Sequence, residues 1–333
     1  MSQPTMMRLM ALSINTAKRA GSIIRDVMQK GNLGIIDKGK DDLQTEADRS
    51  AQRCIIASLS KSFPKIKIIG EEGGSDLNVK NDWLVTTEDE DFLKNACPDQ
   101  WLNVNDDDVV VWVDPLDGTS EYTQGFLDHV TVLIGIAVKD SAVGGIIHQP
   151  YFKNPGGEMG RTIWGLKGLG TGGFERISPP KDKFIVTTTR SHSNAIVQAA
   201  LDALNPTDVI KVGGAGYKVL QLLEGKAHAY VFASPGCKKW DTCAPEAVLE
   251  SQGGTLTDML GNHYSYGANV NHPNLQGVLA TNGDVSHSDI ISKLPSNVLE
   301  AMKSNNDNDF SVQSCYSNRY FVRKVLCKTL SRK

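Results

Sequence analysis

The chain has 333 residues, of which 40% are hydrophobic and 22% are charged, and its formal net charge is −3. This composition is typical of a globular protein and excludes a disordered or fibrous chain. The small net charge gives no support to general nucleic-acid binding, and no apolar run reaches the roughly 18 to 20 residues that span a membrane.

The N-terminal part is expected to hold two helices and a short strand. Apolar residues at helical spacing predict one helix from about Met6 to Gln29 and another from about Thr45 to Ser62. Ile66 to Ile69 is typical of a strand. Residues 71–108 then carry twelve acidic residues without a clear period, so we expect an acidic insert that is mostly a solvated loop.

A strand-rich region follows the insert. Val109 to Val113 is apolar and β-branched, and we expect this strand to stop at Asp114-Pro115. Val130 to Val138 is a second apolar run, and Gly144 to His148 is expected to pair with it across a polar turn.

The second half alternates strands with helices, which favours a layered α/β or α+β fold. From about Lys303 the chain becomes polar, and Arg319 to Lys333 has six basic residues and no acid, which is typical of a mobile tail. The expected elements are strands at Phe184–Thr188, Ala229–Ala233 and Val278–Thr281, and helices at Asn194–Leu204, Tyr217–Leu223 and Ala244–Ser251.

The sharpest chemical signal is the run from Asp114 to Thr119, Asp-Pro-Leu-Asp-Gly-Thr, at the end of an apolar strand. Pro115 fixes one backbone torsion and Gly118 permits a tight turn, so Asp114 and Asp117 can converge. Hard divalent cations require such converging oxygen ligands. The alternative is an acidic turn with an aspartate cap.

Three further segments place carboxylates at the edges of predicted elements. Glu71 follows a strand, Asp241 precedes a helix after Trp240, and Asp48 lies near the start of the second helix. Each has an ordinary alternative: an exposed glutamate pair for Glu71, a helix N-cap for Asp241, and a solvated helix residue for Asp48.

Together the four segments resemble the inositol monophosphatase superfamily of lithium-sensitive, magnesium-dependent phosphatases. Its signature pieces are a Gly-Glu-Glu segment, an Asp-Pro-Leu-Asp-Gly-Thr segment and a late Trp-Asp before a helix, and all three are present. The stretches at 112–125, 187–194, 212–216 and 232–242 resemble the bisphosphate nucleotidase branch. The resemblance covers about Met7 to Pro295 and departs in the insert at 75–108 and after about Lys303.

The resemblance implies a role for each matching residue. Glu71, Asp114 and the backbone carbonyl of Leu116 would bind one Mg²⁺, and Asp114, Asp117 and Asp241 a second, with a third, weaker ion near Glu71. Asp48 and Thr119 correspond to the pair that positions and deprotonates the attacking water; Asp48 is needed because a hydroxyl alone is a poor base. The implied substrate-binding positions are Thr119, Thr189, His192, Gly214, Lys218 and Asp241.

The implied fold is an α/β (α+β) layered sandwich of alternating helix and sheet layers. It would occupy residues 1–302 as two fused halves, at about 1–175 and 176–302, and leave a flexible basic tail at 303–333. The Gly213–Gly216 loop is expected to bring backbone amides close to a phosphate, and Lys218 to supply charge for the second phosphate of a bisphosphate.

The implied reaction is the hydrolysis of adenosine 3',5'-bisphosphate to AMP and phosphate by a metal-activated water, with inhibition by Li⁺. The 2',5'-isomer and 3'-phosphoadenylyl sulfate would be further substrates, and the implied role is removal of a by-product of sulfotransferase reactions. The expected partner is therefore a small bisphosphate nucleotide, and neither a nucleic acid nor a membrane. Scattered cysteines without CxxC spacing and the lack of a secretory signal favour the cytoplasm. The oligomeric state is left open, and a monomer is compatible with the sequence.

Three alternatives remain open from the sequence. One is inositol polyphosphate 1-phosphatase activity on inositol 1,4-bisphosphate, on the same scaffold. A second is a haloacid-dehalogenase type of phosphatase, but its two aspartates are two positions apart, whereas Asp114 and Asp117 are three apart, and it needs a covalent aspartyl-phosphate. A third is a catalytically inactive nucleotide sensor, which would not need both Asp48 and Thr119.

Overall fold

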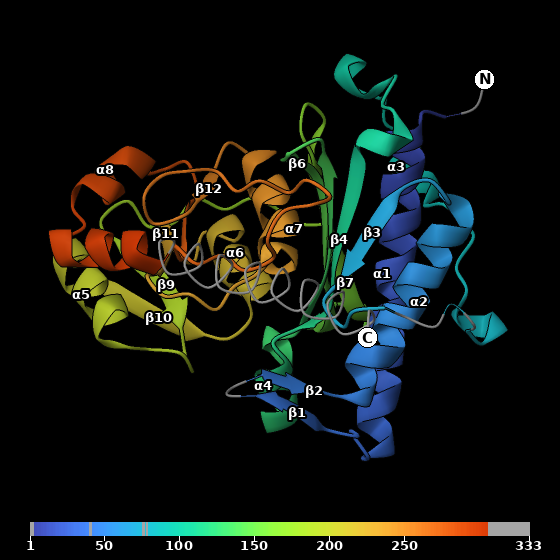
Figure 1. Cartoon of the computed structure of the whole chain (residues 1–333), viewed down its shortest axis with the longest axis horizontal. Helices are drawn as coiled ribbons and strands as arrows, with labels where there is room; N and C mark the ends of the chain where they lie inside the picture. Colours follow the sequence, from blue (N-terminus) through green and yellow to red (C-terminus); the bar gives the residue numbers. More distant parts are fainter. Residues whose placement is uncertain (1–2, 40–41, 75–76, 78, 306–333) are drawn as a thin grey trace, which may run out of the picture.

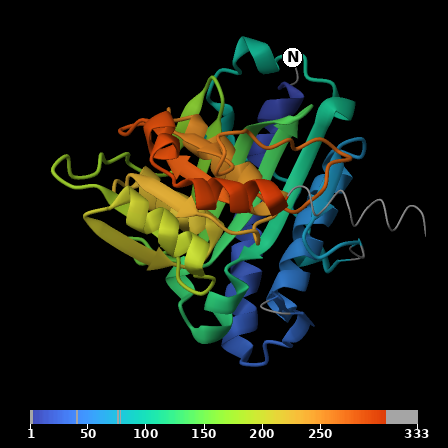
Figure 2. The ribbon, with the colours of Figure 1, turned by 60° about the vertical axis from the view of Figure 1, so that its left-hand side comes forward.

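The computed structural model describes residues 3–39, 42–74, 77 and 79–305. These residues form a six-stranded sheet, a five-stranded sheet and a two-stranded hairpin. Helices α1 (Thr5–Lys30) and α2 (Glu46–Ser62) lie side by side against the six-stranded sheet, on its side away from the second sheet (Figures 1 and 2). Both predicted N-terminal helices are confirmed to within one residue at each end.

Apolar β-branched runs build the six-stranded sheet, whose strand order is β3-β4-β5-β6-β7-β8. The strands β4, β5 and β6 are buried over most of their length, as their composition predicts. The expected antiparallel pairing of β5 with β6 is confirmed. The bounds are β3 (Lys67–Gly70), β4 (Val109–Asp117), β5 (Thr131–Val138), β6 (Ser141–Lys153), β7 (Met159–Leu166) and β8 (Gly170–Gly172).

The end of β4 differs from the expectation. The strand does not stop at Asp114-Pro115 but continues to Asp117, pairing Asp114 with Leu133 and Asp117 with Thr131. The register shifts between the two pairs. A proline lacks the N–H that a regular ladder requires, so it fits at such an irregularity, and the bulge turns both aspartates toward the same edge.

The second sheet has the order β10-β9-β11-β13-β12, and helices α6 and α7 lie between it and the first sheet (Figure 1). Helices α5 and α8 lie at the far end of the molecule, beyond this sheet. The layered α/β fold expected from the sequence is confirmed. The bounds are β9 (Ile185–Thr189), α5 (Ala195–Leu204), β10 (Asp208–Val212), α6 (Ala215–Leu223), β11 (Ala229–Phe232), α7 (Lys239–Glu250), β12 (Thr255–Thr257), β13 (Val278–Thr281) and α8 (His287–Ser292).

Helix α7 packs very closely on the six-stranded sheet. A Cβ atom on Gly135 would lie 2.6 Å from the backbone nitrogen of Ala244, and one on Gly145 would lie 2.4 Å from its carbonyl oxygen. Only glycines at these sheet positions allow the helix to come so near. The start of α7 is thereby held at the edge of the sheet where β4 ends.

The helix α7 also begins earlier than expected. The sequence suggested a start at Ala244 with Asp241 as the N-cap, but the helix starts at Lys239 and Asp241 lies in its first turn. The Asp241 carboxylate accepts a hydrogen bond from the Lys238 backbone N–H at 2.6 Å, which supports this earlier turn. Pro245 lies inside the helix.

The acidic insert is more ordered than a solvated loop. It contains α3 (Glu90–Leu93), and Phe92 is buried with its ring edge-on to Trp164 at 4.9 Å between centroids. Other elements that the sequence did not indicate are the hairpin of β1 (Ile36–Gly39) with β2 (Asp42–Gln44), and the short helical turns η1 (Asn81–Trp83), η2 (Asp99–Trp101), η3 (Asp106–Asp108) and η4 (Leu127–His129), together with α4 (Thr119–Gln124), β7, β8, β10, β12 and α8.

Residues 296–305 are helical and belong to the packed core. Val298 and Met302 are buried, and the Asn305 side chain donates a hydrogen bond to the Leu275 carbonyl at 3.1 Å. The described core therefore continues through residue 305. The rest of the expected tail lies outside the described residues. Among the described helices, none combines the length and the apolar composition needed to cross a membrane.

Candidate active site

A cavity of about 460 Å³ opens where the end of β4, the start of α4, the loop before α6 and the first turn of α7 meet. It brings together residues from both halves of the chain. Every metal-binding and substrate-binding position expected from the sequence lines it: Glu71, Asp114, Leu116, Asp117, Thr119, Thr189, His192, Gly214, Lys218 and Asp241. Asp48 stands behind Thr119 and reaches the cavity through it.

Asp48 is not a solvated helix residue but is fully buried. Its Oδ2 accepts hydrogen bonds from the Thr45 backbone N–H at 2.7 Å and the Thr45 hydroxyl at 2.5 Å, which caps α2. Its Oδ1 faces the Thr119 hydroxyl at 3.0 Å. Burial raises the pKa of Asp48 to about 6, although the hydrogen bonds from Thr45 and Thr119 oppose the rise.

Asp114 and Asp117 converge at the irregular end of β4, and both are buried. Asp114 Oδ1 accepts the Leu116 backbone N–H at 3.0 Å, and the Leu116 carbonyl faces the Thr119 hydroxyl at 3.1 Å. Burial raises the pKa of Asp114 well above its usual range, and the nearby carboxylates of Glu71 and Asp117 add to the rise. The Asp-Pro-Leu-Asp run is thus more than an acidic turn at the surface.

The Gly213–Gly216 loop holds Asp117 rather than offering those amides to a phosphate. The backbone N–H groups of Ala215 and Gly216 each donate to the Asp117 carboxylate at 2.8 Å, and the Thr131 hydroxyl donates at 2.7 Å. A Cβ on Gly214, whose φ is +70°, would lie 2.9 Å from Asp117 Oδ2. The glycines are required because the start of α6 approaches this carboxylate so closely.

Glu71 and Asp241 complete the acidic wall of the cavity. Burial, followed by the charges of Asp241 and Glu72, raises the pKa of Glu71 to about 8. Burial, followed by the charge of Asp117, raises the pKa of Asp241 to about 6. Lys38 and Lys238 lie 4.0 and 3.9 Å from Glu71 Oε1, and their charges oppose this rise in the pKa of Glu71 without cancelling it.

The acidic wall suits hard divalent cations. Its donors are all oxygens, from four carboxylates and the Leu116 carbonyl. Burial raises the pKa of all four carboxylates, and the charge of at least one neighbouring carboxylate adds to the rise for Glu71, Asp114 and Asp241. A divalent cation would relieve this repulsion, and Mg²⁺ prefers oxygen ligands of this kind. The residues present therefore fit the group that the sequence implied.

Lys218 and its neighbours provide positive charge and hydrogen-bonding groups that could bind a second anionic group. Lys218 is 6% exposed, and its ammonium donates to the Gly214 carbonyl at 3.0 Å and lies 5.4 Å from the centre of the Tyr230 ring. Thr189 accepts the His192 backbone N–H at 3.0 Å, which shapes the turn after β9. Lys218 and Lys238 both line the cavity, together with the hydroxyl of Thr189 and the imidazole of His192.

Sequence reasoning missed an ion pair at the cavity, between the buried Glu121, which lines it, and the partly buried Arg190. Glu121 is 3% exposed and pairs with Arg190 at 3.1 Å, while Arg190 also stacks over the Phe126 ring at 4.3 Å. A Cβ on Gly213 would lie 1.9 Å from the Glu121 side chain. Nothing in the local spacing of Glu121 and Arg190 links them. Lys238 was missed too, although it adjoins the Trp240-Asp241 segment and could have been suspected there.

Comparisons with known proteins identify the family of this chain. The model of the inositol monophosphatase family matches residues 6–299. The chain is 50% identical over 305 residues to the human protein named 3'(2'),5'-bisphosphate nucleotidase 1, covering 90% of this chain and 98% of the human one. It is 32% identical over 302 residues to the bovine protein named Golgi-resident adenosine 3',5'-bisphosphate 3'-phosphatase, covering 86% and 79%.

A solved structure supports the fold. The extragenic suppressor protein suhB from Bartonella henselae superposes with a TM-score of 0.63 at 21% identity, covering 86% of this chain and 97% of the other. At this identity the likeness shows the fold alone.

Proposed function

The chain belongs to the inositol monophosphatase family, and on this premise we propose that it hydrolyses the 3'- (or 2'-) phosphate of adenosine 3',5'-bisphosphate to give AMP and phosphate. The observation that carries the proposal is a single cavity lined both by the acidic wall and by Lys218. The acidic wall would serve the phosphate that is cleaved, and Lys218 the phosphate that stays. The names of the human and bovine relatives support the nucleotide as substrate.

The family is generally Mg²⁺-dependent and Li⁺-sensitive. In this chain we assign one ion to Glu71, Asp114 and the Leu116 carbonyl, a second to Asp114, Asp117 and Asp241, and a weaker third to the region of Glu71. When bound, magnesium supplies positive charge that offsets the charge of the phosphate oxygens and of the leaving oxygen. Asp117 is held in place for this by Ala215, Gly216 and Thr131.

Thr119 and Asp48 would move the proton of the attacking water. The Thr119 hydroxyl can accept a proton from water while passing its own to Asp48 Oδ1, 3.0 Å away. A pKa of about 6 makes Asp48 a better proton acceptor than an ordinary aspartate, yet leaves it ionised at neutral pH. The two hydrogen bonds from Thr45 keep its other oxygen fixed, so the pair is oriented before substrate binds.

Lys218, Thr189 and His192 would bind the rest of the nucleotide. A charge-assisted hydrogen bond from the Lys218 ammonium would hold the 5'-phosphate, or the phosphosulfate of 3'-phosphoadenylyl sulfate. Removal of the bisphosphate by-product of sulfotransferases, with the reaction taking place in the cytoplasm, is the role we propose. The alternative substrate, inositol 1,4-bisphosphate, would use the same acidic wall but is less well supported by the names of the relatives.

Phosphate release from a panel of substrates tests this proposal. The panel is adenosine 3',5'-bisphosphate, adenosine 2',5'-bisphosphate, 3'-phosphoadenylyl sulfate, AMP and inositol 1,4-bisphosphate, each assayed with Mg²⁺, with Mg²⁺ plus Li⁺, and with a chelator. We expect phosphate release from the nucleotide bisphosphates in the presence of Mg²⁺, less release when Li⁺ is added, and none with the chelator. A preference for inositol 1,4-bisphosphate would make that compound the proposed substrate in place of the nucleotide. Activity in the presence of the chelator would refute the metal-dependent mechanism.

A further inference from the structure

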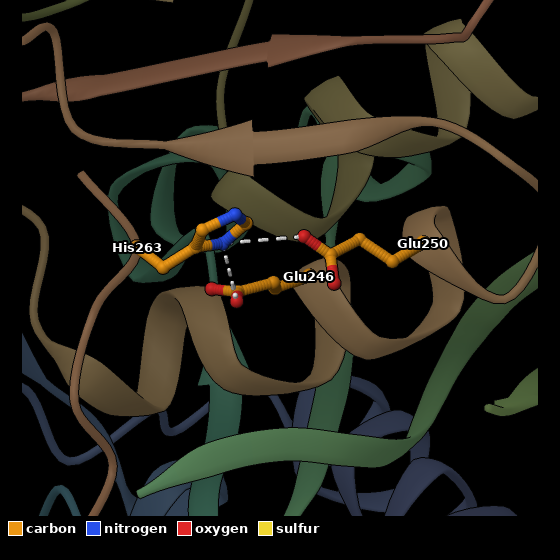
Figure 3. Close-up of side chains that lie close together, drawn as sticks. All are labelled: Glu246, Glu250 and His263. Carbon is orange, nitrogen blue, oxygen red and sulfur yellow. Dashed lines mark ion pairs between the residues drawn. The ribbon is translucent and has the colours of Figure 1, made fainter. Parts of the chain in front are cut away.

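A second group of potential metal ligands lies outside the active site, on the middle and end of α7. Glu246 and Glu250 stand one turn apart on this helix, and His263 faces them from the loop after β12 (Figure 3). The His263 Nδ1 lies 3.4 Å from Glu246 Oε1 and 3.4 Å from Glu250 Oε1. The three ligand atoms lie within 4.8 Å of one another. We call these residues the α7 trio.

Glu246 is held by a partner behind it. Its side chain is 3% exposed, and its Oε2 accepts a hydrogen bond from the buried Tyr266 hydroxyl at 2.5 Å. The other oxygen is then free to face His263. Carboxylates that bind metals are commonly oriented in this way by a hydrogen bond to the oxygen that does not bind.

Glu250 presents a buried acceptor that lacks a donor. The Lys167 ammonium lies 2.6 Å from Glu250 Oε2. Glu250 Oε1 is buried and receives no hydrogen bond from any of the described residues. A buried carboxylate oxygen without a hydrogen-bond donor is unfavourable, and the nitrogen that faces this one is His263 Nδ1 at 3.4 Å. A metal ion held by all three groups would satisfy this oxygen.

From these contacts we propose that the α7 trio binds a divalent transition-metal ion, of which Zn²⁺ is the best match. One imidazole nitrogen and two carboxylate oxygens suit zinc, whereas Mg²⁺ prefers oxygen ligands throughout. Two carboxylates and a neutral imidazole carry a charge of −2, which Lys167 only half offsets. Three protein ligands leave one position of a tetrahedral zinc for water.

The ion would link α7 to the loop on which His263 lies. That loop also reaches the other end of the helix, where Lys238 and Pro273 form a β-bridge and Lys239 donates to the Asn274 side chain at 2.5 Å. Asp241 follows directly in the first turn of α7. Zinc is therefore expected to stabilise the back of the active site rather than to take part in the reaction.

Zinc binding to the full-length chain tests the site. The chain is freed of metals with a chelator and returned to saturating Mg²⁺, so that the acidic wall of the active site is blocked. Isothermal titration with zinc chloride then gives the stoichiometry and affinity, and the melting temperature is read with and without zinc. We compare the wild type with His263→Ala, Glu250→Gln and the matched control Glu158→Gln, an exposed carboxylate in the turn between β6 and β7.

The wild type and Glu158→Gln are expected to bind one zinc per chain and to melt at a higher temperature with zinc. His263→Ala and Glu250→Gln are each expected to bind zinc weaker by about tenfold or more and to lose the zinc-dependent rise in melting temperature. His263 is 59% exposed, so its loss should not prevent folding. Equal zinc binding by all four proteins, or none by the wild type, would overturn the proposal and leave the trio as an ion pair only.

Discussion

Replacing Asp48 with asparagine separates the proton-transfer role from metal binding. The change keeps the shape of the side chain but removes the negative charge that faces the Thr119 hydroxyl at 3.0 Å. Asp48 lies outside the acidic wall, so its loss should leave the metal ligands in place. General bases contribute about 10²- to 10⁴-fold, and we expect kcat to fall within that range while the Mg²⁺ concentration for half-maximal activity stays unchanged.

The stability of this variant follows from the same contacts. Burial raises the pKa of Asp48 from 3.8 to about 6, so the ionised form is disfavoured in the folded state by about 3 kcal/mol. Because the folded state holds this proton more tightly, the cost develops as the pH rises from about 4 to about 6 and remains above it. Asparagine avoids that cost but weakens the cap of α2, at about 1 kcal/mol. The variant should therefore be at least as stable as the wild type at neutral pH and less stable below about pH 4.

The assay pairs steady-state phosphate release from adenosine 3',5'-bisphosphate with thermal unfolding at neutral and acidic pH. Glu46→Gln is the matched control, because it removes a charge from the same first turn of α2 and its side chain is 41% exposed. The control should keep its kcat. Asp48→Asn with a wild-type kcat would refute the proton relay. A fall in kcat that Mg²⁺ at higher concentration restores would assign Asp48 to metal binding instead.

Three further predictions follow from named contacts. Lys218→Ala should weaken bisphosphate binding by about 1.5 to 3 kcal/mol and hardly change binding of a simple monophosphate; an equal loss for both, measured as KM, would assign the residue to stability. Gly216→Ala would place a Cβ 2.5 Å from Thr131 Oγ1 and 3.1 Å from Asp117 Oδ2. It should therefore lower the free energy of unfolding, measured with denaturant, by about 1 to 3 kcal/mol and also lower kcat. An unchanged kcat would show that Asp117 need not be held so closely. A chain ending at Asn305 should keep its melting temperature and its rate. A chain ending at Pro295 loses the buried side chains of Val298 and Met302, whose burial stabilises the fold by about 1.5 to 3 kcal/mol each, and should melt at a lower temperature. Matching melting curves for the two truncated chains would refute the packing of residues 296–305.

The sequence predicted the elements whose signal is local. The two N-terminal helices and the strand β5 were found within one residue of their true bounds. The strands β4 and β6 were found too, but β4 extends to Asp117 and β6 from Ser141 to Lys153, well beyond the expected bounds. The short edge strands β10 and β12 were missed because three to five residues give too little alternation to distinguish a strand from a loop. The early start of α7 was missed because it is supported by the hydrogen bond from the Lys238 backbone N–H to the Asp241 carboxylate, and not by a period of apolar residues.

The composition of the site was easier to predict than its internal contacts. A resemblance can transfer which carboxylates meet: Glu71, Asp114, Asp117 and Asp241 line one cavity, and Asp48 lies behind Thr119. It did not reveal that the amides of Ala215 and Gly216 are already bonded to Asp117, because that contact joins segments 98 and 99 residues apart. The pairing of Arg190 with Glu121, 69 residues apart, was hidden for the same reason.

The central claim is that the acidic wall binds the metal ions on which hydrolysis of a bisphosphate nucleotide depends. Asp114→Asn tests it most directly, because Asp114 would be shared by two ions and is buried among the other carboxylates. We predict that, with saturating Mg²⁺ and adenosine 3',5'-bisphosphate, this variant releases no phosphate above background while its melting temperature without metal is not lowered, because a buried charge has been removed. Phosphate release at the wild-type rate would contradict the account.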